Sequence, residues 1–226
     1  MLNLVKKIKN KIEYITRPLR QNLSYLLHRT TSYIKFKLSK NEFSKINLCS
    51  GPVMLPNYLN IDKGVGVDLV WDLAKSFPPI KSNSIDVLVC ISSINYFTRT
   101  RGKEIIEQIY RILKPGGIAR FGTQDLRLIA EKYINRDEAF FFQKNADGND
   151  RFRGKTMCDK VNSWFYGYKT AGGTGKYFYD YETLELLFKE SGFSLVERKN
   201  FRESRIKDIE KIDNREDQMF FLEAIK

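Results

Sequence analysis

The stretch Asn47-Leu-Cys-Ser-Gly-Pro-Val-Met-Leu-Pro-Asn-Tyr-Leu-Asn-Ile-Asp62 joins two short apolar runs through a turn that contains glycine and proline. The runs Ile46–Leu48 and Tyr58–Ile61 predict two strands of the continuously apolar kind found in parallel sheets covered on both faces. About nine residues separate these strands, whereas a crossover between parallel strands normally needs about a dozen or more. We therefore expect the first crossover to be shortened to a turn of helix or less.

Strand and helix patterns alternate through the rest of the chain. Further apolar runs predict strands at Val67–Trp71, Ile85–Cys90, Ile118–Phe121, Ser194–Arg198 and Met219–Ile225. Apolar residues at helical spacing predict a helix that stops at Lys114–Gly117, a helix over Leu126–Ile134, and a helix from the N-cap Asp180 to Gly192. The predicted fold class is α/β, a Rossmann-like, doubly wound, mostly parallel seven-stranded sheet with an antiparallel last strand.

The net charge of +12 is concentrated near the N-terminus. Residues 1–40 contain ten Lys and Arg against one acid, so they carry 10 − 1 = +9, which leaves 12 − 9 = +3 for residues 41–226. Positive and negative side chains nearly cancel in residues 41–226, so this domain lacks the strong positive charge typical of a nucleic-acid-binding protein. We expect a basic helical extension over residues 1–40 and a single packed domain over residues 41–226.

The basic extension has two interpretations. Residues 4–15 place apolar side chains on one helical face between lysines, Pro18 is expected to end or kink that helix, and a second apolar stripe runs from Leu19 to Leu27. One interpretation is a basic amphipathic helix that lies on the anionic inner face of a membrane. The other is a helix that caps the main domain and keeps its lysines in water.

Cysteine and histidine usage argues against a metal site and against a disulfide framework. The three cysteines, Cys49, Cys90 and Cys158, are widely spaced, and His28 is the only histidine. No apolar run approaches the ~18 residues that span a bilayer, and the first residues lack the apolar stretch of a signal peptide. We expect a cytoplasmic protein that contains no metal.

Polar residues follow four predicted strands, at the edge where an open α/β sheet binds ligands. Gly51 follows the first strand, Asp62 the second, Asp72 the third, and Ser92 with Ser93 the fourth. A glycine lets the backbone approach a ligand closely, and carboxylates can accept hydrogen bonds from ribose hydroxyls and from an adenine amino group. Together these residues favour a nucleoside-shaped ligand. The alternative for each carboxylate taken alone is a strand-end cap.

Three other ligand-binding or catalytic motifs are absent. A dinucleotide fingerprint G-x-G-x-x-G would need glycine at positions 49, 51 and 54, where the chain has Cys49, Gly51 and Met54. The P-loop pattern G-x-x-x-x-G-K-[ST] and the nucleophile elbow G-x-S-x-G do not occur either.

The ordered series of motifs resembles class I S-adenosylmethionine (SAM)-dependent methyltransferases. It is most similar to a bacterial group whose first motif reads roughly L-G-C-G-P-x-x-L-P-G-W-x-N-[IV]-D. The resemblance covers roughly residues 45–226 and rests on residues 47–62, Trp71–Leu73, Ser84–Val87, Leu113–Gly117, Gln124–Leu126, Tyr179–Leu184, Glu190–Phe193, Glu203–Arg205 and Leu222–Lys226. No single motif is specific for this family, but the order and spacing of the whole series are specific for it.

This resemblance implies SAM as the cofactor and methyl transfer as the reaction. It implies that the turn at residues 49–51 holds the methionine end of SAM, that Asp62 binds the ribose, and that Asp72 and Leu73 bind the adenine. With the serine at the fourth strand end, the predicted cofactor-binding residues are Cys49, Ser50, Gly51, Asp62, Asp72, Leu73 and Ser92. Cys49 departs from the family, which usually has glycine at that position.

Methyl transfer from a sulfonium depends mainly on the alignment of nucleophile, methyl carbon and sulfur. A hydroxyl acceptor also gains from a general base, and because the main domain lacks histidine, the candidates are Asp125 and Tyr96. The preferred hypothesis is O-methylation of a small molecule or a glycan precursor. The alternatives are an RNA-directed methyltransferase anchored by residues 1–40 and a non-catalytic SAM-fold binding protein.

The segment 137–179 combines six glycines with interleaved aromatic residues. A connection of this length is usually functional, so we expect an irregular substrate-side insert or lid. Trp164, Tyr166 and Tyr177 are the predicted substrate-binding residues, with a purely packed lid as the alternative.

Overall fold

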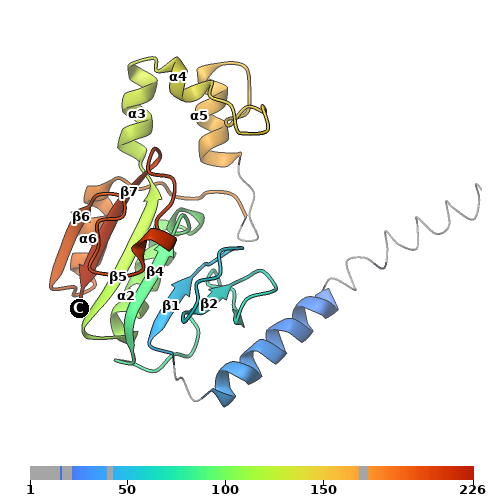
Figure 1. Cartoon of the computed structure of the whole chain (residues 1–226), viewed down its shortest axis with the longest axis vertical. Coiled ribbons are helices and arrows are strands. Elements are labelled where there is room, and N and C mark those ends of the chain that lie inside the picture. Colours follow the sequence, from blue (N-terminus) through green and yellow to red (C-terminus); the bar gives the residue numbers. More distant parts are fainter. Residues whose placement is uncertain (1–15, 17–21, 40–42, 168–172) are drawn as a thin grey trace, which may run out of the picture.

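The computed structural model describes residues 16, 22–39, 43–167 and 173–226 (Figure 1). They form a seven-stranded sheet with the strand order β3-β2-β1-β4-β5-β7-β6. Strands β1 to β5 pair in parallel, whereas β7 runs antiparallel to both of its neighbours, β5 and β6. The predicted fold class is confirmed. The strands are β1 (Lys45–Leu48), β2 (Leu59–Asp62), β3 (Leu69–Val70), β4 (Ile85–Ile91), β5 (Leu113–Gln124), β6 (Leu195–Lys199) and β7 (Met219–Ile225).

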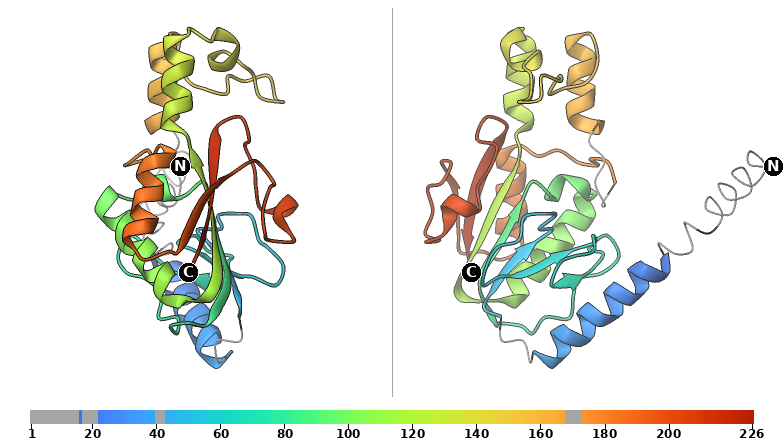
Figure 2. Two further views of the ribbon diagram at one scale, coloured as in Figure 1. Left: turned by 90° about the vertical axis from the view of Figure 1, so that its left-hand side faces the viewer. Right: turned by 45° about the vertical axis from the view of Figure 1, so that its right-hand side comes forward.

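One face of the sheet is covered by the helices α2 (Arg99–Ile112) and α6 (Tyr181–Glu190) (Figure 2). Thr98 caps α2 by accepting a hydrogen bond from the Arg101 amide, and Asp180 caps α6 in the same way through the Thr183 amide. The apolar stripe of α2 is buried against the strands, in agreement with the periodicity of the sequence.

The opposite face is covered without a long helix. Ile206, Ile209 and Ile212, from the connection between β6 and β7, pack against Tyr58 and Val89. That connection contains only the short 3-10 helix η2 (Ile209–Lys211). Within the described residues, no helix joins β1 to β2, as the short spacing predicts. The connection between β6 and β7 therefore covers the part of this face that a helix between β1 and β2 would otherwise cover.

A buried arginine fixes this connection to the sheet. Arg120 of β5 is fully buried and donates from Nε to Oδ1 of Asp213 at 3.2 Å. It also donates to the backbone carbonyls of Glu203 and Asn200, and its Nη1 lies 3.6 Å from the buried carboxylate of Glu223. Because these charges are shielded from water, each depends on the others for compensation.

The N-terminal helix, residues 22–38, lies along the edge strand β3 (Figure 1). Its Phe36 is buried in the main core, and the Ser32 hydroxyl accepts a hydrogen bond from the Val70 amide at 3.1 Å. The predicted helix over 4–15 and its stop at Pro18 lie outside the described residues. Of the helices in the described ranges, none has the length and apolar character needed to cross a membrane.

A helical layer stands beyond the carboxyl ends of the strands (Figures 1 and 2). It consists of α3 (Leu126–Ile134), α4 (Glu138–Phe141) and α5 (Met157–Tyr166). The sequence predicts α3 but an irregular segment over 137–179, and this second prediction is wrong for α4 and α5. Thr156 and Asp159 form a capping box that begins α5. The layer has its own core, made of Ile129, Phe140, Phe141, Phe152 and Trp164.

Candidate functional site

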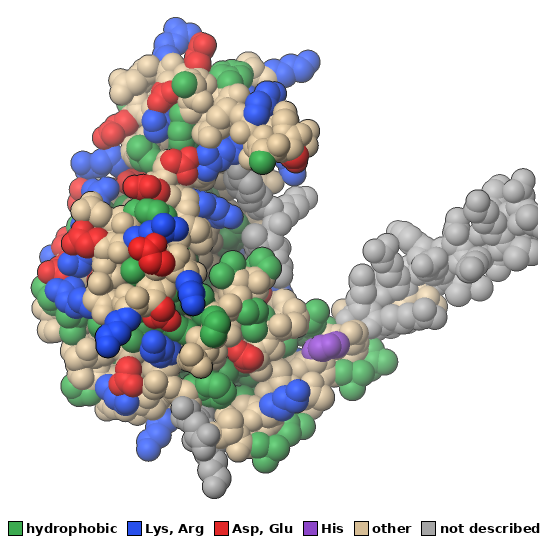
Figure 3. Space-filling view, in the orientation of Figure 1, with side chains coloured by type: hydrophobic (Ala, Val, Ile, Leu, Met, Phe, Trp, Pro, Cys, Tyr) green, Lys and Arg blue, Asp and Glu red, His purple; other side chains and the backbone are tan. Residues whose placement is uncertain are grey.

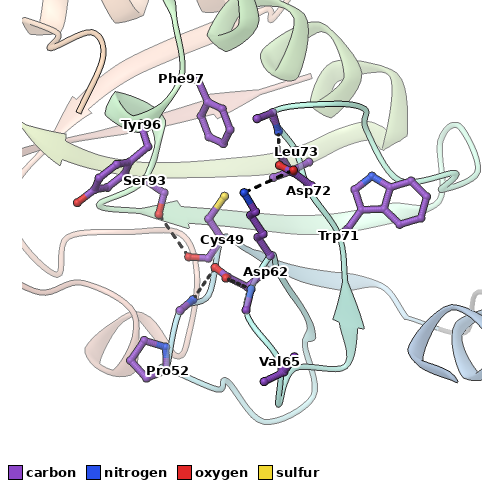
Figure 4. Close-up of a pocket in the computed structure, with 14 residues that line it drawn as sticks. Cys49, Pro52, Asp62, Val65, Trp71, Asp72, Leu73, Ser93, Tyr96 and Phe97 are labelled. Atoms are coloured by element: carbon purple, nitrogen blue, oxygen red, sulfur yellow. Dashed lines mark hydrogen bonds and ion pairs between the residues drawn. The ribbon is translucent and has the colours of Figure 1, made fainter. Parts of the chain in front are cut away.

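A cavity of about 510 Å³ opens at the carboxyl edge of the sheet (Figure 4). This volume lies within the range of small-molecule sites. The turns after β1, β2 and β3 line it, together with the segment after β4 that contains the 3-10 helix η1 (Ile94–Tyr96). The lining residues are Cys49, Gly51, Pro52, Asp62, Lys63, Gly64, Val65, Trp71, Asp72, Leu73, Ala74, Ser93, Tyr96 and Phe97.

The turn after β1 adopts left-handed backbone at two positions. Cys49 has φ 56° and Gly51 has φ 54°. The Ser50 amide donates to the Ile61 carbonyl at 3.1 Å, which holds the turn against β2. A β-carbon in this region is unfavourable, so Cys49 adopts at some cost the backbone that a glycine would take freely.

Asp62 connects the turns that follow β1 and β2. Its Oδ2 accepts a hydrogen bond from the Gly51 amide at 3.0 Å, and its Oδ1 accepts one from the Gly64 amide at 2.7 Å (Figure 4). A carboxylate offers about four acceptor positions, so each oxygen keeps one for a ligand. The two glycine amides thus fix the carboxylate at the cavity wall with two acceptors available, as many as the adjacent hydroxyls of a ribose require.

Asp72 occupies the corresponding place after β3. Its Oδ1 accepts from the Ala74 amide at 3.1 Å, and its Oδ2 lies 3.6 Å from the ammonium of Lys63. The cavity lining therefore contains one cation and two carboxylates, a formal charge of 1 − 2 = −1. A net negative lining favours a ligand that carries positive charge.

The remaining walls are largely apolar. Trp71 and Leu73 come from the β3 side, and Tyr96 and Phe97 from the β4 side (Figure 4). Flat, apolar walls on two sides of a slot suit a planar heterocycle, with polar groups at its edges to fix its orientation.

The thiol of Cys49 stays protonated. Its neighbour Cys90 and its own burial raise the pKa of Cys49 well above the ordinary value. A neutral thiol is a poor nucleophile, so this side chain contributes shape rather than reactivity to the cavity.

Two predicted cofactor residues lie outside the cavity lining. Ser50 is buried behind the turn, where its hydroxyl donates to the Gly51 carbonyl at 3.3 Å. Ser92 adopts φ 61° and accepts a hydrogen bond from Nη1 of Arg215 at 2.7 Å. Its neighbour Ser93 lines the cavity instead and donates to the Ile91 carbonyl at 2.9 Å and to the Cys49 carbonyl at 3.3 Å.

The two predicted base residues lie in different surroundings. Tyr96 lines the cavity. Asp125 does not, and its Oδ1 caps α3 by accepting from the amides of Arg127 and Leu128. Desolvation by burial raises the pKa of Asp125 despite the opposing hydrogen bonds and the Arg198 guanidinium at 3.4 Å.

The predicted substrate residues are dispersed. Trp164 is buried in the core of the helical layer, Tyr166 is exposed at the end of α5, and Tyr177 is half-buried with its ring centroid 4.8 Å from that of Tyr179. None of the three lines the cavity. Lys63, Trp71 and Phe97 line the cavity but were not predicted as site residues from the sequence. Lys63 and Trp71 lie within two residues of a predicted strand end, which was the available signal, whereas Phe97 lies seven residues beyond Cys90.

Part of the chain is similar to known proteins. Residues 30–121 match a family model described as a methyltransferase domain. Over 146 residues the chain is 27% identical to O-methyltransferase 3 of Dictyostelium discoideum, a match that covers 60% of this chain and 27% of that protein. The chain thus spans about a quarter of that relative's length.

Solved structures with a similar arrangement include a SAM-dependent methyltransferase from Thermotoga maritima, with a TM-score of 0.45, 16% identity and full coverage of both chains. A SAM-dependent methyltransferase from Archaeoglobus fulgidus has a TM-score of 0.48 and 12% identity, covering 88% of this chain and 94% of that one. The matched range 30–121 contains every residue of the cavity lining. Residues 30–121 are therefore similar to the methyltransferase-domain family, and this match supports SAM as the cofactor.

Proposed function

We propose that the chain is a SAM-dependent methyltransferase whose cofactor binds in the cavity at the carboxyl edge of the sheet. One observation carries the proposal. Asp62 is held by the amides of Gly51 and Gly64 so that both of its oxygens keep an acceptor position beside the cavity. If Asp62 were only a cap at the end of β2, it would have to accept hydrogen bonds from the backbone amides but would not need free acceptor positions beside a cavity.

The resemblance of the motif series supports the following placement of the cofactor in the cavity. Asp62 binds the ribose hydroxyls, and Asp72 accepts from the adenine amino group while Leu73 contacts the ring. The turn at residues 49–51 holds the methionine end. The net negative lining compensates the positive charge of the sulfonium.

The bound cofactor supplies an activated methyl group on a positively charged sulfur. The protein has to align the acceptor with that methyl group, and good alignment alone accounts for much of the rate. The aromatic rings of Tyr96 and Phe97 exclude water from one wall of the cavity. Tyr96 is the better-placed candidate base of the two proposed, because it lines the cavity and Asp125 caps α3.

The acceptor is a hydroxyl of a small molecule or a glycan precursor. The similarity to O-methyltransferase 3 supports an oxygen acceptor. The layer formed by α3, α4 and α5 stands beyond the same sheet edge and supplies the surface on which an acceptor is selected (Figure 2).

The test begins with calorimetric titration of the full chain with the demethylated product of SAM. Asp62→Asn removes the charged acceptor and is expected to weaken binding by about 10- to 100-fold. Asp86→Asn is the matched control, since Asp86 lies at the amino end of β4 and pairs with Lys114 at 2.7 Å. Equal affinities of the two variants would rule out the cavity as the cofactor site.

Transfer of labelled methyl from SAM into fractionated cell extract then tests the reaction. Label in a low-molecular-weight fraction that resists amine-specific chemistry supports O-methylation. Label in RNA or protein contradicts the proposed acceptor. Tight binding without transfer to any fraction contradicts the enzymatic activity while leaving the cofactor site intact.

A further inference from the structure

The N-terminal helix has two faces, and only one of them contacts the domain. Ser32 and Phe36 are buried on the inner face, and Tyr33 packs on Trp71 with ring centroids 5.9 Å apart. The Arg29 guanidinium lies over the same Trp71 ring, 5.4 Å from its centroid. These contacts fix the rotation of the helix about its own axis.

The outer face carries large apolar side chains that no other described residue buries. Their exposed fractions are 60% for Leu23, 53% for Leu26, 58% for Leu27, 51% for Ile34 and 75% for Leu38. Leu23, Leu27, Ile34 and Leu38 are spaced by four, seven and four residues, so they lie on one side of the helix as a stripe that only Thr30 and Thr31 interrupt. In Figure 3 hydrophobic side chains gather along the outer edge of this helix.

The helix that carries the stripe is basic, although its Arg29 packs over Trp71 on the inner face. The helix contains Arg29, Lys35 and Lys37 but no acidic residue, and the sequence has no acid between Glu13 and Glu42. Residues 1–40 together carry +9. An exposed apolar stripe within a basic segment is the composition of helices that lie in the interface of an anionic bilayer.

We infer that the outer face of the N-terminal helix binds the surface of an anionic membrane, with the stripe of Leu23, Leu27, Ile34 and Leu38 inserted between the headgroups. This inference does not depend on the proposed methyltransferase activity. It also reconciles the two interpretations of the extension, because the helix caps the domain with one face and leaves the other for lipid.

Charge favours a membrane over the other occupants of such a face. Two copies of a segment that carries +9 repel each other, and the centre of a protein interface is depleted of lysine. RNA would be held by the cations alone and would leave the apolar stripe in water. Anionic headgroups compensate the lysines and arginines, while the acyl region accepts the leucines.

The experiment is co-sedimentation of the full chain with vesicles of phosphatidylcholine alone and with vesicles that also contain about 30% phosphatidylglycerol. Wild-type protein is expected to bind the anionic vesicles and to be released by added salt. Leu27→Gln with Ile34→Gln is expected to reduce the bound fraction by about tenfold at equal lipid. Both side chains are exposed, so the variant keeps its fold, which circular dichroism confirms.

The matched control is Ile134→Gln with Leu186→Gln, which makes the same chemical change at exposed sites on α3 and α6. It is expected to bind like the wild type. Failure of the wild type to bind anionic vesicles, or equal binding by both double variants, would overturn the inference. So would a wild-type dimer in analytical ultracentrifugation that Leu27→Gln with Ile34→Gln dissociates, because a second copy would then cover the stripe.

Discussion

The ammonium of Lys63 lies 3.6 Å from Oδ2 of Asp72, so a cation from the end of β2 faces the carboxylate proposed to bind adenine. Both residues line the cavity, as does Asp62, and Figure 4 shows the two carboxylates of Asp62 and Asp72 there. Lys63 is partly exposed, and a pair of this kind contributes little to folding stability. The pair matters for cofactor binding instead. Lys63 competes with the purine for Asp72, and it reduces the negative charge of the cavity.

Replacing Lys63 by Met is expected to tighten cofactor binding. The change frees Oδ2 of Asp72 and makes the lining more negative, which favours the positively charged cofactor over its neutral-sulfur product. Calorimetry should show a Kd for SAM that falls by about two- to fivefold, with a smaller change for the demethylated product. Lys103→Met removes an exposed pair with Glu190 away from the cavity and serves as the control. Weaker SAM binding by Lys63→Met would mean that Lys63 is itself a cofactor ligand.

Substitutions at Cys49 are expected to separate backbone shape from thiol chemistry. Cys49→Gly keeps the left-handed φ of 56° without a β-carbon, so its affinity for the demethylated cofactor should stay within about threefold of the wild type. Cys49→Val places a β-branched side chain at that φ and should lower the free energy of unfolding by about 1–2 kcal/mol. Urea unfolding and calorimetry measure the two effects. Loss of binding in Cys49→Gly would show that the sulfur itself contacts the ligand.

Removal of Arg120 is expected to be among the most destabilising changes in the domain. Arg120→Leu leaves the fully buried carboxylates of Asp213 and Glu223 without their cation, which typically costs about 3–5 kcal/mol. Arg127→Leu breaks the exposed pair with Glu182 and should cost about 1 kcal/mol or less. Urea denaturation of both variants gives the comparison, and similar midpoints would contradict the importance of the buried network.

Because of Asp125, the free energy of unfolding is expected to fall as pH rises. Burial raises its pKa in the folded state above the unfolded value, so the folded protein holds the proton more tightly. The resulting stabilisation is complete below about pH 3.9 and is lost as pH rises through the folded-state pKa. Asp125→Asn keeps the helix cap and should remove this part of the slope in thermal unfolding measured from pH 4 to 7.

The same variant tests whether Asp125 acts as a base. If it takes the acceptor proton, turnover should fall by about 100-fold or more at unchanged cofactor affinity. Unaltered turnover would remove Asp125 from that role and leave Tyr96 as the candidate to be tested by Tyr96→Phe.

The strand ends of the site could be predicted from sequence because parallel strands deliver their carboxyl ends to one edge. Position alone therefore brings Gly51, Asp62 and Asp72 together, and the structure places all three in the cavity lining. The choice between Ser92 and Ser93 could not be made in this way. It depends on the left-handed φ of Ser92, which turns the chain after β4 so that Ser93 faces the cavity.

The helix α4 escaped prediction because it is only four residues long. In α5 the apolar residues Met157, Val161 and Trp164 do recur at helical spacing, but the glycines and aromatic residues around them obscured this pattern. Their stability comes from packing between segments distant in sequence, such as Trp164 against Phe178 with ring centroids 5.5 Å apart. The capping box at Thr156 and Asp159 was the available local signal. The cover of the second sheet face by residues 200–218 has no local signal at all, since it depends on buried partners of Arg120 more than 80 residues away.

The segment that covers the second face of the sheet, residues 200–218, is translated after the strands that it covers. A nascent chain that has emerged from the ribosome as far as residue 199 contains every residue of the cavity lining. It still exposes Val89 and Tyr58 to water, because Ile206, Ile209 and Ile212 have not yet been translated. Arg120 likewise lacks its ion-pair partner until Asp213 has been translated. The second face of the sheet is therefore the last part of the domain to be covered, and its central strands stay exposed to aggregation until residues 200–218 have been synthesised.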